Sequence, residues 1–228
     1  NWTLPEPTAA SYTQELIDNA KSFSDTAMVV ISRVGGEMAD LPTNMDGLNY
    51  TENSTEYNDF EPGQHYLSLT KTEKNMIDMV TKNFANVVLV YNGANTLEMG
   101  FVNDYPQIKS VIWCPGTGQT GFNALGEIVA GEVNPSGHSA DTFVYDLTAA
   151  PYFNNIGDFA YTNADSVGYT VASQAGGDAK LVPPHFVNYV EGIYVGYKFY
   201  ETAADEGLID YDEEVVYPFG YGLSYTSF

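Results

Sequence analysis

The residues of this sequence best suited to chemistry follow an apolar run, Met28 to Ile31, that ends abruptly in a charged and Gly-rich segment, Arg33 to Asp40. Such a boundary is typical of a buried strand that gives way to a loop at the edge of a sheet. Gly35 and Gly36 stand just before Glu37 and permit backbone conformations that other residues avoid. The pattern predicts that the Glu37 carboxylate is held at a sheet edge, where it can face a cleft. A solvated glutamate in a surface loop is the alternative reading of the segment.

The elements that must position Glu37 are those of a mostly parallel sheet. Helices are expected over residues 11–23, 69–85 and 121–132, and strands over residues 28–31, 87–91 and 110–114. Strands that are apolar on both faces and alternate with helices indicate an α/β fold with helices on both faces of the sheet, a flavodoxin-like three-layer sandwich. Right-handed crossovers bring the loops that follow parallel strands to one edge. We therefore expect the Glu37 segment, residues 92–95 and residues 115–120 to lie together and form a site.

Side-chain spacing adds detail to these elements. Thr72 is the expected N-cap of the second helix, and apolar residues of the second and third helices should face inward. The inward positions are Met76, Ile77, Val80 and Phe84 in the second helix, and Phe122, Leu125, Ile128 and Val129 in the third. Residues 41–66 predict a long loop at the same edge as Glu37. Alternating aromatic and β-branched residues predict extended segments over 190–200 and 215–225, separated by an acidic, solvated loop over 201–214.

Composition narrows the class of ligand. With 228 residues and 44% hydrophobic content, the chain can bury the core of one large domain. Eight basic and thirty acidic residues give a formal net charge of −22, which disfavours nucleic acid and anionic membranes and favours neutral ligands. The first five residues lack the basic and apolar regions of a signal peptide, and no apolar run approaches membrane-spanning length.

Metal and cofactor chemistry find little support in the sequence. The single cysteine, Cys114, lies in an apolar run and is predicted to be a buried, inert thiol. His65, His138 and His185 are far apart and give no metal-ligand spacing. The Gly-rich run 115–121 lacks the lysine and the spacing of a phosphate-binding loop. We therefore expect no metal and no cofactor.

Four segments, in order along the chain, resemble one known domain. They are VVISRVGGEMAD at 29–40, PGTGQTGFNAL at 115–125 with NPSG at 134–137, YVEGIYVGYKFY at 189–200, and YPFGYGLSYT at 217–226. Together they are similar to glycoside hydrolase family 3, in the α/β sandwich domain that follows the catalytic barrel in many β-glucosidases. The resemblance implies a sandwich domain over residues 1–223 and the start of an exit linker at 224–228. The family's domain usually opens with one more strand, which nothing upstream of Ser11 supplies, so we expect either a start partway into the domain or a rearranged domain order.

The resemblance implies a part in a retaining β-glucosidase that hydrolyses terminal non-reducing β-glucosyl residues. Two carboxyl groups carry out that reaction. In the family the nucleophile is an aspartate of the barrel, and the acid/base is the glutamate that Glu37 matches. Arg33 and Asp40 match charged positions around it, where each would form a loop-bracing ion pair or contact a sugar hydroxyl. The implied partners are a (β/α)8 barrel of the same parent chain and a β-linked glucoside or short oligosaccharide.

The sequence also departs from the family pattern. Met38 replaces the usual glycine after the glutamate, Leu41 stands where an arginine often follows the aspartate, and HSADTF at 138–143 replaces a more familiar RLP-x-TF. Because the chain is too short to hold the barrel, the nucleophile is missing, and we expect the 228 residues alone to be inactive.

Three alternatives remain open at this point. The chain could be a non-catalytic sugar-binding or structural α/β domain, a free-standing flavodoxin-like module for a small ligand, or the corresponding domain of a β-xylosidase. Tyr152, Tyr161 and Tyr169 could stack on sugar rings, since an aromatic face suits the C–H surface of a pyranose, although a tyrosine in a long loop more often only packs.

Overall fold

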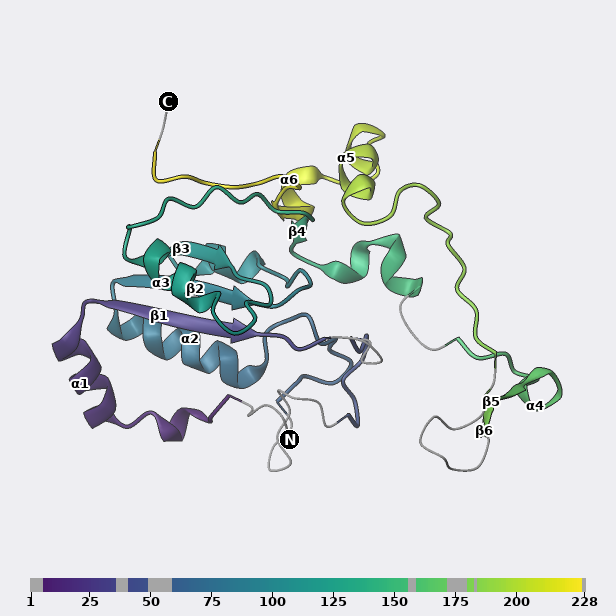
Figure 1. Cartoon of the computed structure of the whole chain (residues 1–228), viewed down its shortest axis with the longest axis horizontal. Helices are drawn as coiled ribbons and strands as arrows, with labels where there is room; N and C mark the ends of the chain where they lie inside the picture. Colours follow the sequence, from purple (N-terminus) through teal and green to yellow (C-terminus); the bar gives the residue numbers. More distant parts are fainter. Residues whose placement is uncertain are drawn as a thin grey trace.

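The fold is built on a three-stranded parallel sheet (Figure 1). The computed structural model describes residues 6–35, 41–48, 59–155, 159–171, 180–182 and 184–226. Strands β1 (Thr26–Ser32), β2 (Asn86–Asn92) and β3 (Ile108–Trp113) pair in the order β1-β2-β3, and both pairs are parallel. The predicted α/β class with a mostly parallel sheet is confirmed.

The register of the sheet aligns the ends of its strands. Ser32 of β1 stands opposite Asn92 of β2, and the backbone N–H of Arg33 donates to the Asn92 carbonyl at 3.1 Å. On the other side of β2, the N–H of Cys114 donates to the Tyr91 carbonyl at 2.8 Å. The loops that follow the three strands therefore start at one edge of the sheet, as parallel connections require.

Helix α2 (Lys71–Asn83) packs on β1 and β2 and begins with a capping box. The Thr70 hydroxyl accepts from the Glu73 N–H at 3.1 Å, and the Glu73 carboxylate accepts from the Thr70 N–H at 2.9 Å. Each side chain thus satisfies a backbone donor that has no partner within the helix. The prediction of Thr72 as N-cap is wrong by two residues, because the Thr72 hydroxyl instead donates to Asp59 at 2.5 Å.

The main core lies between α2 and the sheet. Alternation along β1 buries Val29 and Ile31 and leaves Met28 and Val30 about half exposed on the other face. The inward positions predicted for α2 are confirmed, with Ile77 fully buried and the other three packed against the same cluster. The buried members of the cluster are Val29, Ile31, Leu69, Ile77, Val87, Leu89, Tyr91, Leu97, Met99 and Phe143.

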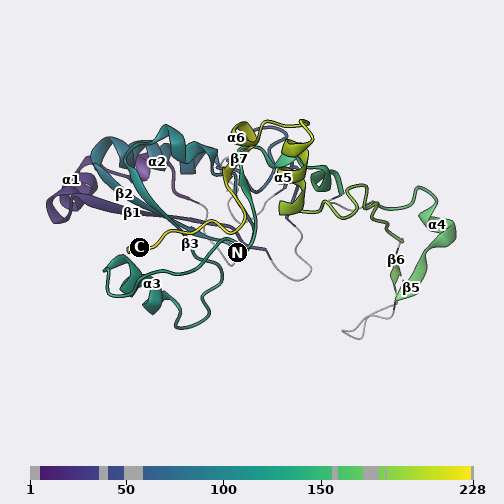
Figure 2. The same ribbon diagram turned by 90° about the horizontal axis from the view of Figure 1, so that it is seen from above.

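Helices α1 (Gln14–Phe23) and α3 (Phe122–Val129) contain no buried residue. Figure 2 shows α3 on the side of the sheet opposite α2, where it stands away from the strands. Phe122 and Val129 are 53% and 40% exposed, so the prediction that α3 turns these residues inward is wrong. The helix has the expected amphipathic spacing but buries none of its residues, and the Tyr225 hydroxyl donates to its Ile128 carbonyl at 2.8 Å.

A smaller layer follows the sheet in the sequence. β4 (Phe143–Val144) pairs antiparallel with β7 (Val215–Tyr217), and α5 (Tyr197–Asp205) and α6 (Tyr211–Glu214) lead into β7. Tyr200 and Ala203 of α5 are buried, and Tyr200 packs in a second cluster with Val144. The predicted solvated loop over 201–214 is therefore wrong, and so is the end of the extended segment predicted over 190–200. The apolar residues are spaced for one face of a helix, and burial of that face decides the conformation.

Short 3₁₀-helices and one excursion complete the chain. The 3₁₀-helices are η1 (Ala9–Ser11), η2 (Gly100–Asp104), η3 (Leu147–Ala149) and η4 (Pro151–Asn155). The described parts of residues 159–196 run outward from the smaller layer and return to it (Figures 1 and 2). They contain α4 (Ala164–Val167) and the antiparallel pair β5 (Tyr169–Val171) and β6 (Lys180–Val182). Within the described ranges, no helix combines the length and apolar character needed to cross a membrane.

Candidate functional site

A cavity of about 440 Å³ opens beside the carboxyl ends of β1 and β2. Gly35, which follows β1, and residues 94–96, which follow β2, form part of its wall. The rest of the wall comes from the segment before α2 and from the chain around β4, η3 and η4. Gly35, at the start of the loop after β1, thus lies beside the loop after β2, in agreement with the prediction for the described part of that loop, whereas residues 115–120 after β3 do not line the cavity. The end of β3 packs on β2 instead, where Trp113 Nε1 donates to the Gly93 carbonyl at 2.8 Å.

Glu37 lies in the sequence between two residues of the cavity wall. Gly35 and Leu41 both line the cavity, and they pack so closely that a Cβ added at residue 35 would come within 2.8 Å of Leu41 Cδ2. Gly35 has no positive φ. Glycine is therefore needed at this position because there is no room for a side chain, and not for the conformational freedom that the sequence suggests. Glu37 and Asp40, two of the three predicted site residues, lie outside the described residues.

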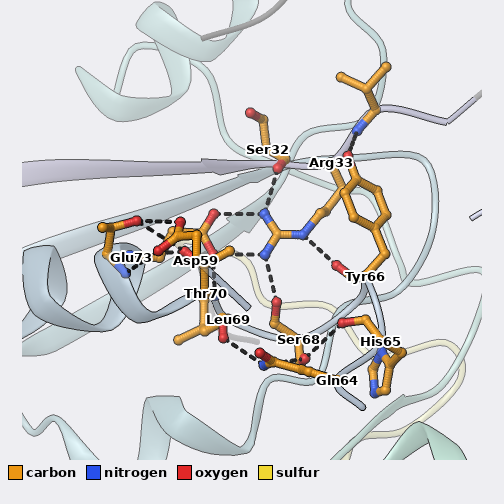
Figure 3. A network of polar contacts seen from close by, with 12 residues as sticks. Ser32, Arg33, Asp59, Gln64, His65, Tyr66, Ser68, Leu69, Thr70 and Glu73 are labelled. Atoms are coloured by element: carbon orange, nitrogen blue, oxygen red, sulfur yellow. Dashed lines mark hydrogen bonds and ion pairs between the residues drawn. The ribbon is translucent and has the colours of Figure 1, made fainter. Parts of the chain in front are cut away.

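Arg33, the third predicted site residue, is buried beside the start of α2 (Figure 3). Its Nη1 and Nη2 atoms each lie 2.7 Å from a different oxygen of Glu73, which makes a bidentate ion pair. Nε donates to the Tyr66 carbonyl and Nη2 donates to the Ser68 carbonyl, both at 2.7 Å. All three guanidinium nitrogens therefore donate within the protein, and Arg33 does not line the cavity.

The Arg33 ion pair joins the end of β1 to the start of α2. Glu73 is also the residue that closes the capping box, so one carboxylate fixes both elements. The next residue along the chain, Val34, donates its backbone N–H to the Tyr66 hydroxyl at 2.9 Å. The backbone is thus held by side chains from residues 66–73 immediately before it reaches Gly35 and the cavity.

His65 is fixed in the cavity wall by partners on both ring nitrogens. Nδ1 accepts from the Leu67 N–H at 3.1 Å, so Nε2 carries the proton and donates to Glu98 Oε1 at 2.8 Å. The same carboxylate oxygen accepts from the Leu147 N–H at 2.9 Å. The imidazole also meets the Phe153 ring edge to face, with centroids 5.5 Å apart. The arrangement holds the Phe153 ring in the wall and links residue 65 to the 147–153 segment.

Asp141 supplies a half-buried carboxyl to the cavity. Burial raises the pKa of this carboxyl, and the hydrogen bond that it accepts from the Thr142 N–H at 2.8 Å offsets only part of the rise. Tyr152, another lining residue, has its hydroxyl 3.3 Å from that of Tyr200, and burial raises the pKa of both phenols. The cavity therefore contains a desolvated carboxyl and an aromatic ring.

Sequence reasoning found some of these residues and missed others. Tyr152, one of three tyrosines considered for sugar stacking, lines the cavity, whereas Tyr161 and Tyr169 lie on the outward excursion. Asp141 and His65 were not predicted as site residues. The available signal for Asp141 was its place in the HSADTF segment at 138–143, which departs from the family pattern. Among the described residues, no three His, Cys, Asp or Glu side chains are grouped so as to hold a metal ion.

Comparison with known proteins gives a consistent result. The model of the glycosyl hydrolase family 3 C-terminal domain matches residues 8–197. β-Glucosidase A of Butyrivibrio fibrisolvens is 31% identical over 222 residues, which are 94% of this chain and 23% of that protein. The β-glucosidase of Ruminococcus albus is 30% identical over 214 residues, 93% of this chain and 17% of that protein. The chain thus spans about a fifth of the length of these relatives.

Solved structures agree with the sequence comparison. The crystal structure of a β-glucosidase from Paenibacillus barengoltzii matches with a TM-score of 0.67 and 28% identity, over 99% of this chain and 19% of that one. The β-D-glucoside glucohydrolase of Trichoderma reesei matches with a TM-score of 0.55 and 21% identity over 94% of this chain, a likeness of fold.

Proposed function

Because the chain belongs to the glycosyl hydrolase family 3 C-terminal domain, we propose that it is the non-barrel domain of a retaining β-glucosidase and that Glu37 is the general acid/base. The substrate class proposed is a β-linked glucoside or short oligosaccharide with a terminal non-reducing glucosyl residue. The names of the similar proteins, all β-glucosidases, support the substrate, and the match of VVISRVGGEMAD to the family's glutamate loop supports the residue.

One observation carries the proposal for Glu37: the two described residues that flank its segment, Gly35 and Leu41, both line the cavity. The segment between them starts and ends at the cavity wall, and Glu37 is only two residues from Gly35. Arg33 and Val34 anchor the chain just before this point. A carboxyl on a short segment with fixed ends is suited to a role that requires a constant distance to a second group.

The proposed chemistry uses two carboxyl groups from two domains. The protonated Glu37 carboxyl donates its proton to the glycosidic oxygen as the bond to the anomeric carbon breaks, while an aspartate of the barrel attacks that carbon. The ionised Glu37 then takes a proton from the water that releases the sugar from the aspartate. Retention of configuration corresponds to carboxyl groups about 5–5.5 Å apart. The proposal requires that the pKa of Glu37 be raised toward the working pH, as burial against the barrel and the nearby charge of the nucleophile would do.

Arg33 serves in this proposal as a brace rather than as a sugar ligand. Its nitrogens are engaged with Glu73 and with backbone carbonyls, and the side chain is buried away from the cavity. We propose that Asp40, three residues after Glu37, braces the other end of the same segment.

The test is a leaving-group series on the full-length protein that contains these residues, with and without Glu37→Gln. For aryl β-glucosides with poor leaving groups, which need protonation, kcat/KM should fall by about 10²- to 10⁴-fold. For a dinitrophenyl glucoside, cleavage of the bond should be nearly unchanged, and added azide should accelerate turnover by forming the glycosyl azide. Glu127→Gln, on the exposed surface of α3, is the matched control. A poor-leaving-group activity within twofold of wild type would rule out the assignment.

Two further measurements separate the alternatives. Because the nucleophile belongs to the barrel, the 228-residue chain alone should not turn over any aryl β-glucoside, and measurable hydrolysis would contradict the two-domain scheme. Comparing kcat/KM for glucosides and xylosides in the full-length protein distinguishes a β-glucosidase from a β-xylosidase. Sugar binding without hydrolysis in the full-length protein would point to the non-catalytic alternative.

A further inference from the structure

The cavity contains a carboxyl group, Asp141, that the proposed acid/base chemistry does not use. This side chain is half-buried and projects from the residue before Thr142 into a space bordered by the loops after β1 and β2. Within the described part of the chain, the hydrogen-bond donor to its carboxylate is the Thr142 N–H at 2.8 Å. A carboxylate can accept about four hydrogen bonds, so Asp141 retains acceptor capacity toward the cavity. Burying that capacity without further donors is unfavourable, which explains why the pKa of Asp141 is raised.

The wall beside Asp141 is aromatic and held in place. Tyr152 lines the cavity, and its hydroxyl lies 3.3 Å from that of Tyr200, a fully buried residue of α5. Phe153 lines it as well and packs edge to face on His65, whose ring nitrogens are both hydrogen-bonded. Rings fixed in this way present an apolar surface at little cost in side-chain entropy.

The charge of the wall selects against anionic ligands. Of the described residues that line the cavity, none is a lysine or an arginine. The chain as a whole carries a formal charge of −22. A volume of about 440 Å³ lies in the usual range for small-molecule sites, about 300–1,000 Å³. The cavity therefore suits a neutral, small ligand with hydroxyl donors for the carboxylate and a C–H face for the ring.

We infer that Asp141 binds hydroxyl groups of the sugar substrate and that the Tyr152 ring packs against the C–H face of the same sugar. This inference rests on the proposed function, because it assigns the sugar contacts of the cavity wall that borders the Glu37 segment. The bonds from sugar hydroxyls to Asp141 are charge-assisted, and each is among the stronger hydrogen bonds in water-excluded sites. Asp141 and Tyr152 would thus determine affinity for the sugar, while Glu37 would determine the rate of bond cleavage.

The test compares Asp141→Asn with wild type in the full-length protein, using cellobiose and glucose as probes. The substitution keeps the size of the side chain and an oxygen that accepts from Thr142, so the thermal midpoint should not fall. KM for cellobiose and the inhibition constant for glucose should each rise about 10- to 100-fold, the range expected for hydrogen bonds to a charged group. Asp205→Asn, an exposed aspartate at the end of α5, is the control and should leave both constants unchanged.

A second pair of variants tests the aromatic contact. Tyr152→Phe removes the hydroxyl but keeps the ring, so the glucose inhibition constant should change less than threefold. Tyr152→Ala removes the ring and should raise that constant about tenfold, which is about 1.4 kcal/mol and lies at the upper end of the range for aromatic contacts. If both variants weaken binding equally, the ring contact is wrong.

The outcome separates this inference from the proposed function. A normal leaving-group effect of Glu37→Gln, together with unchanged sugar constants in Asp141→Asn, overturns the inference alone. Weakened sugar binding in Asp141→Asn without any leaving-group effect of Glu37→Gln overturns the acid/base assignment and leaves the sugar site standing. Tetramethylammonium probes the other ligand class that an aromatic wall with a carboxylate attracts. If tetramethylammonium displaces glucose at lower concentrations than cellobiose does, the site prefers cations to neutral sugars, and the inference fails.

Discussion

Replacing Arg33 with methionine, which removes the guanidinium and keeps an unbranched apolar side chain, should destabilise the chain severely. In the wild type the guanidinium neutralises Glu73 and donates to the carbonyl oxygens of Tyr66 and Ser68, all at 2.7 Å. The methionine variant would leave the Glu73 carboxylate and the carbonyl groups of Ser32, Tyr66 and Ser68 without this donor, in a site where the Glu73 side chain is only 5% exposed. Removing one partner of such a buried pair costs about 3–5 kcal/mol, against a total of about 5–15 kcal/mol for a typical domain.

The companion variant, Glu73→Gln, tests whether charge is the cause. Glutamine keeps an oxygen that can accept from the Thr70 N–H, so the capping box survives, but the Arg33 charge loses its partner. In the double variant neither charge remains. Because the residues are in direct contact, the two single losses should exceed the double loss by about 0.5–3 kcal/mol.

The assay is urea denaturation of the four proteins in the cycle, followed by far-ultraviolet circular dichroism. Lys71→Met is the matched control, because Lys71 forms an exposed pair with Glu61 at 3.5 Å and its loss should change the unfolding free energy by less than about 1 kcal/mol. If Arg33→Met lowers the unfolding free energy by no more than Lys71→Met, with the denaturant dependence unchanged, the interpretation of Arg33 as a structural brace is refuted.

Three other perturbations follow from the structure. Thr70→Ala removes the N-cap of α2 and should lower the unfolding free energy by about 0.5–2 kcal/mol in the same assay, whereas no loss would contradict the role of the capping box. Leu89→Ala, at a position with no exposed surface on the central strand, should cost about 2–5 kcal/mol, while Phe23→Ser, at a side chain 92% exposed, should stay within about 0.5 kcal/mol of wild type. Burial raises the folded-state pKa of Asp141, so the stability that this group contributes is present below its ordinary value of 3.8 and is lost as the pH rises through the folded-state pKa. The stability of Asp141→Asn relative to wild type should therefore increase with pH above 3.8, and thermal scans between pH 3.5 and 7 that show a decrease would contradict this sign.

The sheet and its main helix were predictable because their signals are local. The apolar runs at 28–31, 87–91 and 110–114 all became strands of the parallel sheet, with every end shifted by at most two residues. The helical spacing around Ile77 gave α2 and its buried face. In β2 and α2 the residues that carry the signal include the buried Val87, Leu89 and Ile77, whereas in β1 Val29 and Ile31 are buried and Met28 and Val30 are half exposed.

The smaller layer was not predictable in the same way. In the 197–205 segment, tyrosine and phenylalanine favour strands, yet burial of Tyr200 and Ala203 on one side requires a helix. In α3 the opposite holds, since its apolar spacing is that of a helix with one inward face but none of its residues is buried. A tertiary contact decides both cases, and one sequence does not display such contacts.

The same reasoning applies to the candidate site. The sequence identified Arg33 as a residue next to the Glu37 segment but did not identify Glu73, which lies 40 positions away. In the sequence, Asp141 stood out only as part of a departure from a family motif. It is a candidate site residue because the loops after β1 and β2 form a cavity beside it. The residues that a motif contains can be predicted, and the residues that packing recruits cannot.

The Arg33–Glu73 pair also has a consequence for how β1 finds its place beside β2. Sliding β1 by one residue would exchange the buried Val29 and Ile31 for Met28 and Val30, so the hydrophobic pattern rejects every odd shift. A slide of two residues preserves that pattern, so the pattern does not select against it. The same slide moves Arg33 by about 6.6 Å and separates it from Glu73. The hydrophobic side chains therefore determine which face of β1 turns inward, and Arg33 determines which of the registers that share this face β1 adopts beside β2.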